Sequence, residues 1–272
     1  MTGLISEMFA FPFMVRALVA GSLIALCASL VGVCLVLKRF SMIGDGLSHV
    51  GFSALAIASV CSLAPLAVAI PVVIVAAYLL LRVGDGKLLK GDAAIAIVSV
   101  SALAVGVLIL SLTTGMTTDV NNYMFGSILS MSGTDALVGA IASVVIIALF
   151  VLIYNRMFAV TYDESFFVAT GSSADRYRVI LSMMTAVVVV IGLKLVGAML
   201  ISGLLIFPGV SAMKISKSFK GVTVAAAVIS IVCFVLGLTV SFAFAIPSGA
   251  AIILANLIVM IVCSLIKKPG GN

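Results

Sequence analysis

The stretch FPFMVRALVAGSLIALCASLVGVCLVL, residues 11–37, is an almost unbroken apolar run that contains a single charged residue, Arg16. It is longer than the ~20 apolar residues that an α-helix needs to cross the hydrocarbon core of a bilayer. Backbone polar groups find no water partners in that core, so a segment of this kind folds as a helix. Residues 11–37 therefore predict a transmembrane helix. The residues before it include Glu7 and lack a basic leader, so we expect no cleaved signal peptide.

The remaining sequence repeats this pattern. Hydrophobic residues make up 64% of the 272 residues and charged residues only 9%, whereas about 25% of the residues in a soluble domain are charged. Apolar runs separated by turn residues and charges predict nine spans, near residues 11–37, 45–62, 64–81, 92–113, 134–154, 177–193, 196–213, 221–243 and 248–266. The close junctions at 62–64 and 193–196 leave eight or ten crossings as alternatives. The sequence thus predicts an all-α membrane protein, a polytopic helical bundle that forms a single domain over residues 1–272.

Basic residues lie almost entirely in alternate loops. Of the 15 Lys and Arg residues, only Arg16 and Lys194 fall on the other side of the predicted spans. The positive-inside rule places the basic set in the cytoplasm, which puts the N-terminus outside and the C-terminus in the cytoplasm. The net charge of +6 is therefore explained by topology, and we expect a lipid bilayer and no nucleic acid as a partner.

The segment KRFSMIGDGLSHVGFSALAIA, residues 38–58, contains the only histidine of the chain, His49, and an acid four residues earlier, Asp45. Residues i and i+4 of a helix lie one turn apart on the same face, so the carboxylate and the imidazole can reach a common ion. Ionisable residues at membrane depth are costly and often mark a transport pathway. Oxygen and imidazole ligands together suit Zn(II), Mn(II) or Fe(II). The alternative is that the two side chains hydrogen-bond each other or a neighbouring helix and only stabilise the bundle.

Two ligands leave the coordination shell of such an ion incomplete, since zinc prefers about four. A homodimer whose two-fold axis passes beside this helix would place two carboxylates and two imidazoles around one ion. The sequence therefore suggests a second copy of the chain as a partner.

The residues around the pair resemble a known family. SMIGDGLSHVGFSALAIA (41–58) is similar to the Gly-Asp-x-x-Ser-His stretch of the zinc and manganese importer permeases of the ABC-3 family. Three further segments resemble motifs of the same family in the same order: YMFGSIL (123–129), LKLVGAMLISGLLIFPGVSAM (193–213) and IPSGAAIILAN (246–256). The resemblance covers nearly the whole chain.

This resemblance implies a permease in the cell membrane of a prokaryote. Two copies would assemble with two cytoplasmic ABC ATPase subunits, and an extracytoplasmic metal-binding protein would deliver the ion. Asp45 and His49 match the acid and histidine with which the family contacts its metal. The chain would bind no cofactor of its own, only the transported Zn²⁺ or Mn²⁺. The segment KLVGAMLIS (194–202) favours zinc, with manganese and then iron as alternatives.

A longer cytoplasmic connection near residues 155–176 contains YDESFFVATG (162–171). It resembles the coupling element through which the family contacts its ATPase, and the residues implied in coupling are Asp163, Glu164, Phe166, Ala169 and Gly171, whereas Phe167 stands where alanine is usual. The spacing predicts a short amphipathic helix that presents Phe166, Phe167 and Thr170 on one side, toward the ATPase or, alternatively, only toward lipid.

Pro208 lies within the seventh predicted span. Proline removes a backbone hydrogen bond from a helix interior, so Pro208 is a candidate hinge. Packing against neighbouring helices is the simpler interpretation.

Other functional classes fit the sequence less well. The phosphate-binding pattern G-x-x-x-x-G-K-S/T is absent, so we expect ATP hydrolysis in a separate subunit and no enzyme activity in this chain. An intramembrane metalloprotease is disfavoured because H-E-x-x-H is absent and one histidine cannot build a His-rich zinc site. An ion-coupled secondary metal transporter also places ionisable residues within its spans and is the remaining alternative.

Overall fold

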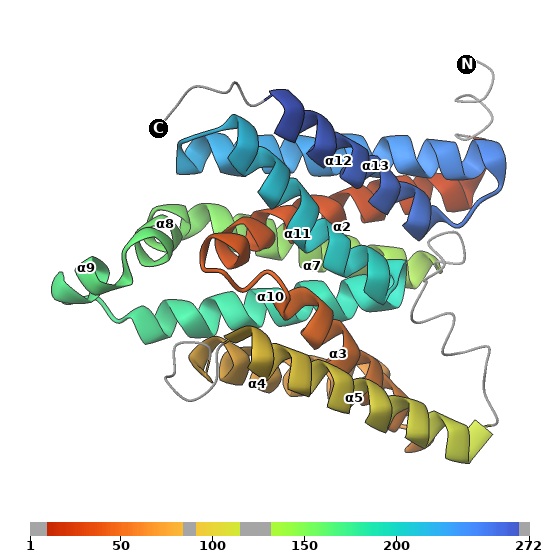
Figure 1. Cartoon of the computed structure of the whole chain (residues 1–272). Coiled ribbons are helices and arrows are strands. Elements are labelled where there is room, and N and C mark those ends of the chain that lie inside the picture. The colour runs from red at the N-terminus through yellow and green to blue at the C-terminus, as the bar shows by residue number, and fades with distance from the viewer. Residues whose placement is uncertain (1–9, 84–90, 115–131, 267–272) are drawn as a thin grey trace.

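The computed structural model describes residues 10–83, 91–114 and 132–266. Within these ranges the chain forms helices and short connections, and no strand (Figure 1). In chain order the helices are α2 (Pro12–Leu37), α3 (Ile43–Val60), α4 (Pro65–Val83), α5 (Gly91–Thr114), α7 (Gly133–Leu152), α8 (Tyr154–Tyr162), α9 (Glu164–Ala169), α10 (Ala174–Val196), α11 (Ala198–Ile215), α12 (Phe219–Phe244) and α13 (Ser248–Ile266).

Nine of the described helices are long and apolar enough to cross a bilayer, namely α2, α3, α4, α5, α7, α10, α11, α12 and α13. The predicted all-α polytopic bundle with nine spans is therefore confirmed. At the 193–196 junction, α10 and α11 are separated by Gly197 alone, whose φ is 93°. A residue with positive φ is most easily glycine, which explains how two spans meet without a loop. The family segment 123–129 lies outside the described residues.

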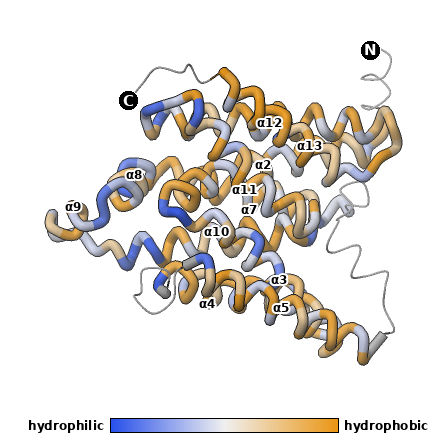
Figure 2. The backbone as a smooth tube through the Cα atoms, viewed as in Figure 1, coloured by the Kyte–Doolittle hydropathy of each residue, from blue (hydrophilic) through white to orange (hydrophobic). Residues whose placement is uncertain are grey.

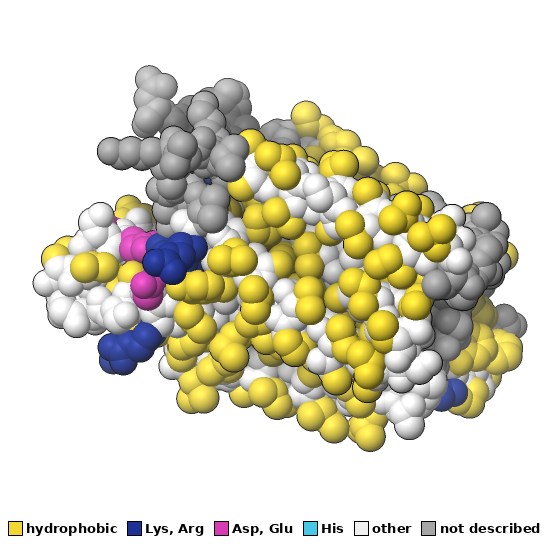
Figure 3. All heavy atoms as spheres, turned by 90° about the horizontal axis from the view of Figure 1, so that it is seen from below, with side chains coloured by type: hydrophobic (Ala, Val, Ile, Leu, Met, Phe, Trp, Pro, Cys, Tyr) yellow, Lys and Arg dark blue, Asp and Glu magenta, His cyan; other side chains and the backbone are white. Residues whose placement is uncertain are grey.

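The spans form an inner and an outer group. About 72% of the most apolar stretch of α2, α3 and α10 is buried inside the chain, against 28% in α4, α5, α7 and α13. Figure 1 shows α2, α10 and α11 crossing the middle, with α12 and α13 on one side and α4 and α5 on the other. The face over α4 and α5 is covered by hydrophobic side chains (Figure 3), as expected where helices contact lipid.

Small residues allow the inner helices to approach closely. A Cβ atom added at Gly32 of α2 would overlap the backbone carbonyl of Leu205 in α11. The Ser230 hydroxyl of α12 donates a hydrogen bond to the Ala25 carbonyl of α2 over 2.8 Å. Close approach at small residues and interhelical hydrogen bonds are the usual means by which helices pack in membranes. These contacts hold α2, α11 and α12 against one another.

Hydrophilic residues gather at the end of the bundle formed by α8, α9 and the start of α10 (Figure 2). Lys38 and Arg178 meet at this end, and both belong to the set that the sequence assigns to the cytoplasm. Lys194 instead pairs with Asp135 at the start of α7, with 2.7 Å between its Nζ and Oδ1. The orientation of the termini relative to the membrane stays a prediction.

Candidate functional site

Asp45 and His49 lie in the first turns of α3, one of the inner helices. Asp45 Oδ2 and His49 Nε2 are 3.7 Å apart, which is longer than the 2.7–3.2 Å of an ordinary N–H···O hydrogen bond. Figure 1 shows that α3 begins within the length of the bundle, further in than the ends of α8, α9 and α12. The structure therefore brings the two side chains together on one face, near the start of a helix that is long and apolar enough to cross a bilayer.

The two side chains of the pair are incompletely satisfied. His49 is 15% exposed and Asp45 is 44% exposed, and the buried Nδ1 atom of His49 has no hydrogen-bond partner among the described residues. The Ser48 hydroxyl donates to the Asp45 backbone carbonyl over 2.7 Å, so it does not serve the carboxylate. Buried polar atoms with a purely structural role normally have partners. The unpartnered nitrogen and the open carboxylate fit a ligand site better than an interhelical hydrogen bond.

Three glycines beside the pair let neighbouring helices approach α3. A Cβ atom at Gly44 would lie 2.7 Å from Leu205 of α11, one at Gly46 2.9 Å from Ile95 of α5, and one at Gly51 3.1 Å from Leu193 of α10. These distances are below ordinary van der Waals contact, so a larger residue at any of the three positions would require the facing Leu or Ile side chain to shift. The pair consequently lies on a closely packed helix, while the Asp45 side chain stays partly exposed.

The described part of the chain does not complete a metal centre around the pair. It contains no group of three or more His, Cys, Asp or Glu side chains that could hold an ion. Zinc usually has about four protein or water ligands. Any further His, Cys, Asp or Glu ligand for an ion at Asp45 and His49 would therefore come from beyond the described residues of this chain.

The predicted coupling residues lie together in the connection between α7 and α10. The Asp163 carboxylate accepts a hydrogen bond from the Phe166 backbone N–H over 2.8 Å and caps α9. Ala169 ends this helix, and Gly171 follows with a φ of 80°, a conformation that favours glycine. Asp163 and Gly171 thus lie at the two ends of α9, the second of the two short helices in this connection.

The two phenylalanines of α9 point in different directions. Phe166 is 67% exposed, whereas Phe167 is buried. The Phe167 ring makes an edge contact with Tyr177 at 5.4 Å between centroids and packs against Val160 and Ala174. The prediction that Phe166 and Phe167 share an outward side is therefore wrong. Consecutive helix residues do not face the same way, and burial against Tyr177 removes the Phe167 ring from water.

Glu164 faces the interior of this end of the protein. Its Oε2 accepts a hydrogen bond from Lys38 Nζ and its Oε1 accepts one from Arg178 Nη2, each over 2.7 Å. Arg178 Nη1 also donates to Asp175 Oδ1 over 3.1 Å. Burial disfavours the charged carboxylate, but the hydrogen bonds and positive charges of Lys38 and Arg178 outweigh burial and lower the pKa of Glu164. Sequence reasoning missed this network, since Lys38 and Glu164 are 126 residues apart.

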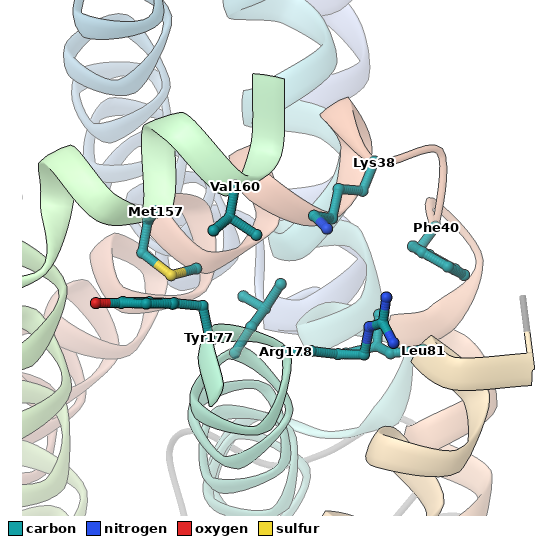
Figure 4. Close-up of a pocket in the computed structure, with 8 residues that line it drawn as sticks. Lys38, Phe40, Leu81, Met157, Val160, Tyr177 and Arg178 are labelled. Atoms are coloured by element: carbon teal, nitrogen blue, oxygen red, sulfur yellow. The ribbon is translucent and has the colours of Figure 1, made fainter. Parts of the chain in front are cut away.

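The two cations of this network border a small cavity at the meeting point of α2, α4, α8 and α10 (Figure 4). Its volume is about 10 Å³, room for roughly one water molecule. The lining residues are Lys38, Phe40, Leu81, Met157, Val160, Tyr177, Arg178 and Leu181. The two cations therefore lie in closely packed, mostly apolar surroundings, whereas Glu164 is 35% exposed.

Pro208 is buried within α11, and this helix continues through it from Ala198 to Ile215. Its hinge role stays a prediction.

Comparison with known proteins gives a consistent picture. The profile of the ABC 3 transport family matches residues 10–267. The manganese import system permease protein ScaB of Streptococcus gordonii is 24% identical over 252 residues, which cover 93% of this chain and 90% of that protein. The high-affinity zinc uptake system membrane protein ZnuB of Haemophilus influenzae is 22% identical over 258 residues, covering 95% of this chain and 98% of that protein.

A solved structure described as PsaBC from Streptococcus pneumoniae in complex with Fab has the same fold. The superposition has a TM-score of 0.87 at 25% identity and covers 97% of this chain and 95% of the other. The family match includes both α3, with Asp45 and His49, and the α8–α9 connection. The two groups of residues singled out above therefore lie within the part of the chain that is shared with its relatives.

Proposed function

The chain belongs to the ABC 3 transport family, and on this basis we propose that it is the transmembrane permease subunit of an ATP-driven importer of divalent transition-metal ions. The observation that carries the proposal is the Asp45–His49 pair, a carboxylate and an imidazole with an unpartnered nitrogen on an inner membrane-spanning helix. Zinc is the proposed ion, with manganese and iron as alternatives. The names of the relatives support both zinc and manganese, since ScaB is named for manganese and ZnuB for zinc.

We infer that a second copy of the chain completes the site. A two-fold axis beside α3 would bring a second Asp45 and His49 to the same ion, giving two carboxylates and two imidazoles. Four such ligands suit tetrahedral zinc, and carboxylates and water also suit manganese. Two features of the protomer support this assembly: the Asp45 carboxylate is partly exposed, and no third His, Cys, Asp or Glu side chain joins the pair within the described residues.

The α8–α9 connection, within residues 155–176 of the single permease domain, is the proposed contact for the cytoplasmic ATPase subunits. Tyr162, Phe166 and Val168 are exposed apolar or aromatic side chains at the hydrophilic end of the bundle. An exposed apolar group with a polar rim is typical of a protein contact. In this arrangement ATP hydrolysis occurs in the other subunits, and the permease provides the path.

The proposed orientation places this end in the cytoplasm of a prokaryotic cell and the N-terminus outside. An extracytoplasmic metal-binding protein would deliver the ion to the opposite end. ATP binding and hydrolysis would then switch the dimer between outward-open and inward-open states, so that the ion passes Asp45 and His49 without a continuous pore.

The test is uptake into liposomes that contain the permease, its ATPase and its binding protein. We expect ATP-dependent uptake of Zn(II), Mn(II) or Fe(II), and the ion taken up fastest at equal free concentration identifies the substrate. The matched variants are Asp45→Asn and His49→Gln, which keep the side-chain size. Uptake driven by an ion gradient, by the chain alone and without nucleotide, would instead support a secondary transporter.

A further inference from the structure

We propose that Glu164 is a positioning residue that connects the ATPase contact to the metal pair through its ion pairs with Lys38 and Arg178. We name these ion pairs the Glu164 link. The inference rests on the proposed function and adds the route by which movement of α9 reaches the helix of Asp45 and His49.

The geometry of Glu164 fixes α9 to two other helices. Glu164 is the first residue of α9, and its two carboxylate oxygens accept separate hydrogen bonds of 2.7 Å from Lys38 and Arg178. Lys38 is the C-cap residue that follows α2, and Arg178 lies in the first turns of α10. Hydrogen bonds between charged groups are about twice as strong as neutral ones. Movement of α9 therefore pulls on the end of α2 as well as on α10.

The surroundings make this connection stiff. The side chains of Lys38 and Arg178 are only 14% and 15% exposed, and that of Glu164 is 35% exposed. The adjoining cavity is about 10 Å³ and is lined mainly by apolar groups. Charge interactions are stronger and less screened by salt in such surroundings than at an open surface. The link should therefore hold at physiological ionic strength.

A tight turn leads from Lys38 into α3. The Phe40 backbone N–H donates to the Leu35 carbonyl over 2.9 Å, and the Ile43 N–H donates to the Phe40 carbonyl over 3.2 Å. Phe40 and Ile43 are also buried. The turn therefore has little freedom to absorb a displacement of Lys38. Asp45 lies in the first turn of α3, directly after this connection, so the displacement reaches the metal pair.

This geometry divides α9 into two functional sides. Phe166 is exposed and available to the ATPase, whereas both carboxylate oxygens of Glu164 are occupied by groups of the permease itself. The resemblance implied that Glu164 couples to the ATPase. The structure assigns it an internal role instead, in which it passes on a movement that Phe166 receives.

The test uses the whole complex with Glu164→Gln, Lys38→Met and the control Asp175→Asn. Asp175→Asn removes only the ion pair between Arg178 and Asp175. This pair is the more exposed one, because the Asp175 side chain is 63% exposed. We expect Glu164→Gln and Lys38→Met to lower metal uptake per ATP hydrolysed about tenfold, a typical coupling between sites. Basal ATPase activity and co-purification with the ATPase should stay normal in all three variants. Lys38→Arg should keep metal uptake per ATP hydrolysed near the wild-type value, because arginine keeps the positive charge.

Hydrogen–deuterium exchange provides a readout that needs no metal. In the wild type, nucleotide binding by the ATPase should change amide exchange in residues 163–170 and also in residues 38–46. In Glu164→Gln and Lys38→Met the change should remain in 163–170 and disappear from 38–46. In the permease alone, the amides of residues 38–46 should exchange faster in both variants than in the wild type. This measurement tests the link even if the wild type takes up no metal and the proposed function is wrong.

Three results would overturn the inference. Normal uptake per ATP in Lys38→Met would do so, as would an unchanged exchange response of residues 38–46 in that variant. Loss of ATPase binding in a folded Glu164→Gln variant would show that Glu164 contacts the ATPase directly. Lys38→Met decides the matter even where Glu164→Gln fails to fold, because Arg178 still balances Glu164 when Lys38 is absent.

Discussion

The Asp45–His49 pair and the Glu164 link each bring a carboxylate close to basic side chains. They differ in how many of their polar atoms have hydrogen-bond partners. In the pair the nearest side-chain atoms are 3.7 Å apart and His49 Nδ1 has no partner within the described chain. In the link both carboxylate oxygens accept hydrogen bonds of 2.7 Å from nearly buried cations. A satisfied network stabilises the fold, whereas an unsatisfied pair keeps capacity to bind. This contrast is the one expected between a structural connection and the metal site that we propose for the pair.

Removing the pair should produce the largest effect. We expect Asp45→Ala and His49→Ala each to reduce ATP-dependent metal uptake by more than the roughly 10–100-fold that loss of an outer-shell partner costs. The thermal unfolding midpoint should barely change, because neither side chain makes a short hydrogen bond in the described structure. Ser48→Ala is the control, since its hydroxyl bonds only a backbone carbonyl. Normal uptake in both pair variants would remove the metal interpretation.

The phenylalanines of α9 sharpen the comparison between an inward and an outward side chain. Phe167→Ala should destabilise the α8–α10 region by about 3 kcal/mol, the lower end for loss of a buried phenylalanine, because the Phe167 ring packs on Tyr177. Phe166→Ala should leave stability unchanged and weaken ATPase binding. Thermal unfolding and co-purification with the ATPase measure the two effects. Equal destabilisation by both variants would contradict the observed burial.

Breaking the link should cost stability, in contrast to breaking the pair. We expect Glu164→Gln to lower the unfolding free energy by about 2 kcal/mol, less than the roughly 3–5 kcal/mol of a fully buried ion pair, because Glu164 is 35% exposed. Thermal unfolding in detergent measures the change. Asp175→Asn is the matched control and should change stability by less than about 0.5 kcal/mol, as for most surface substitutions. A stable Glu164→Gln protein would show that the link contributes no structural energy.

The smallest expected effect is a change in the stability contribution of Glu164 that is confined to acidic pH. The pKa of Glu164 is lower in the folded protein than its ordinary value of 4.5. The ionised form therefore adds stability that is fully present above pH 4.5 and is lost as the pH falls through the lower folded value. The stability difference between wild type and Glu164→Gln should be constant from about pH 7 to about pH 5 and narrow below that. If the stability difference between wild type and Glu164→Gln narrowed near neutral pH, the pKa of Glu164 could not be lowered in the folded protein.

Local features of the sequence predict most of the fold and the pair. Apolar runs of bilayer length predict the spans, and the spacing of Asp45 and His49 predicts a shared face, because both depend on residues close together in the chain. The inward orientation of Glu164 depends on Lys38, which is 126 residues away, and no local pattern encodes that contact. The separation of Phe166 and Phe167 likewise depends on Tyr177 in another helix. The reversal at Gly197 needs a single residue and leaves little signal beyond the glycine itself.

The most direct test of the central claim, that Asp45 and His49 contact the transported ion, is the number of metal ions bound by the assembled complex. Equilibrium binding of Zn(II) and Mn(II) would be measured for wild type, Asp45→Ala and His49→Ala, with bound metal counted per permease chain. The account predicts about one ion per two permease chains in the wild type, as two-fold symmetry requires, and loss of that ion in both variants. Unchanged binding in both variants would contradict it.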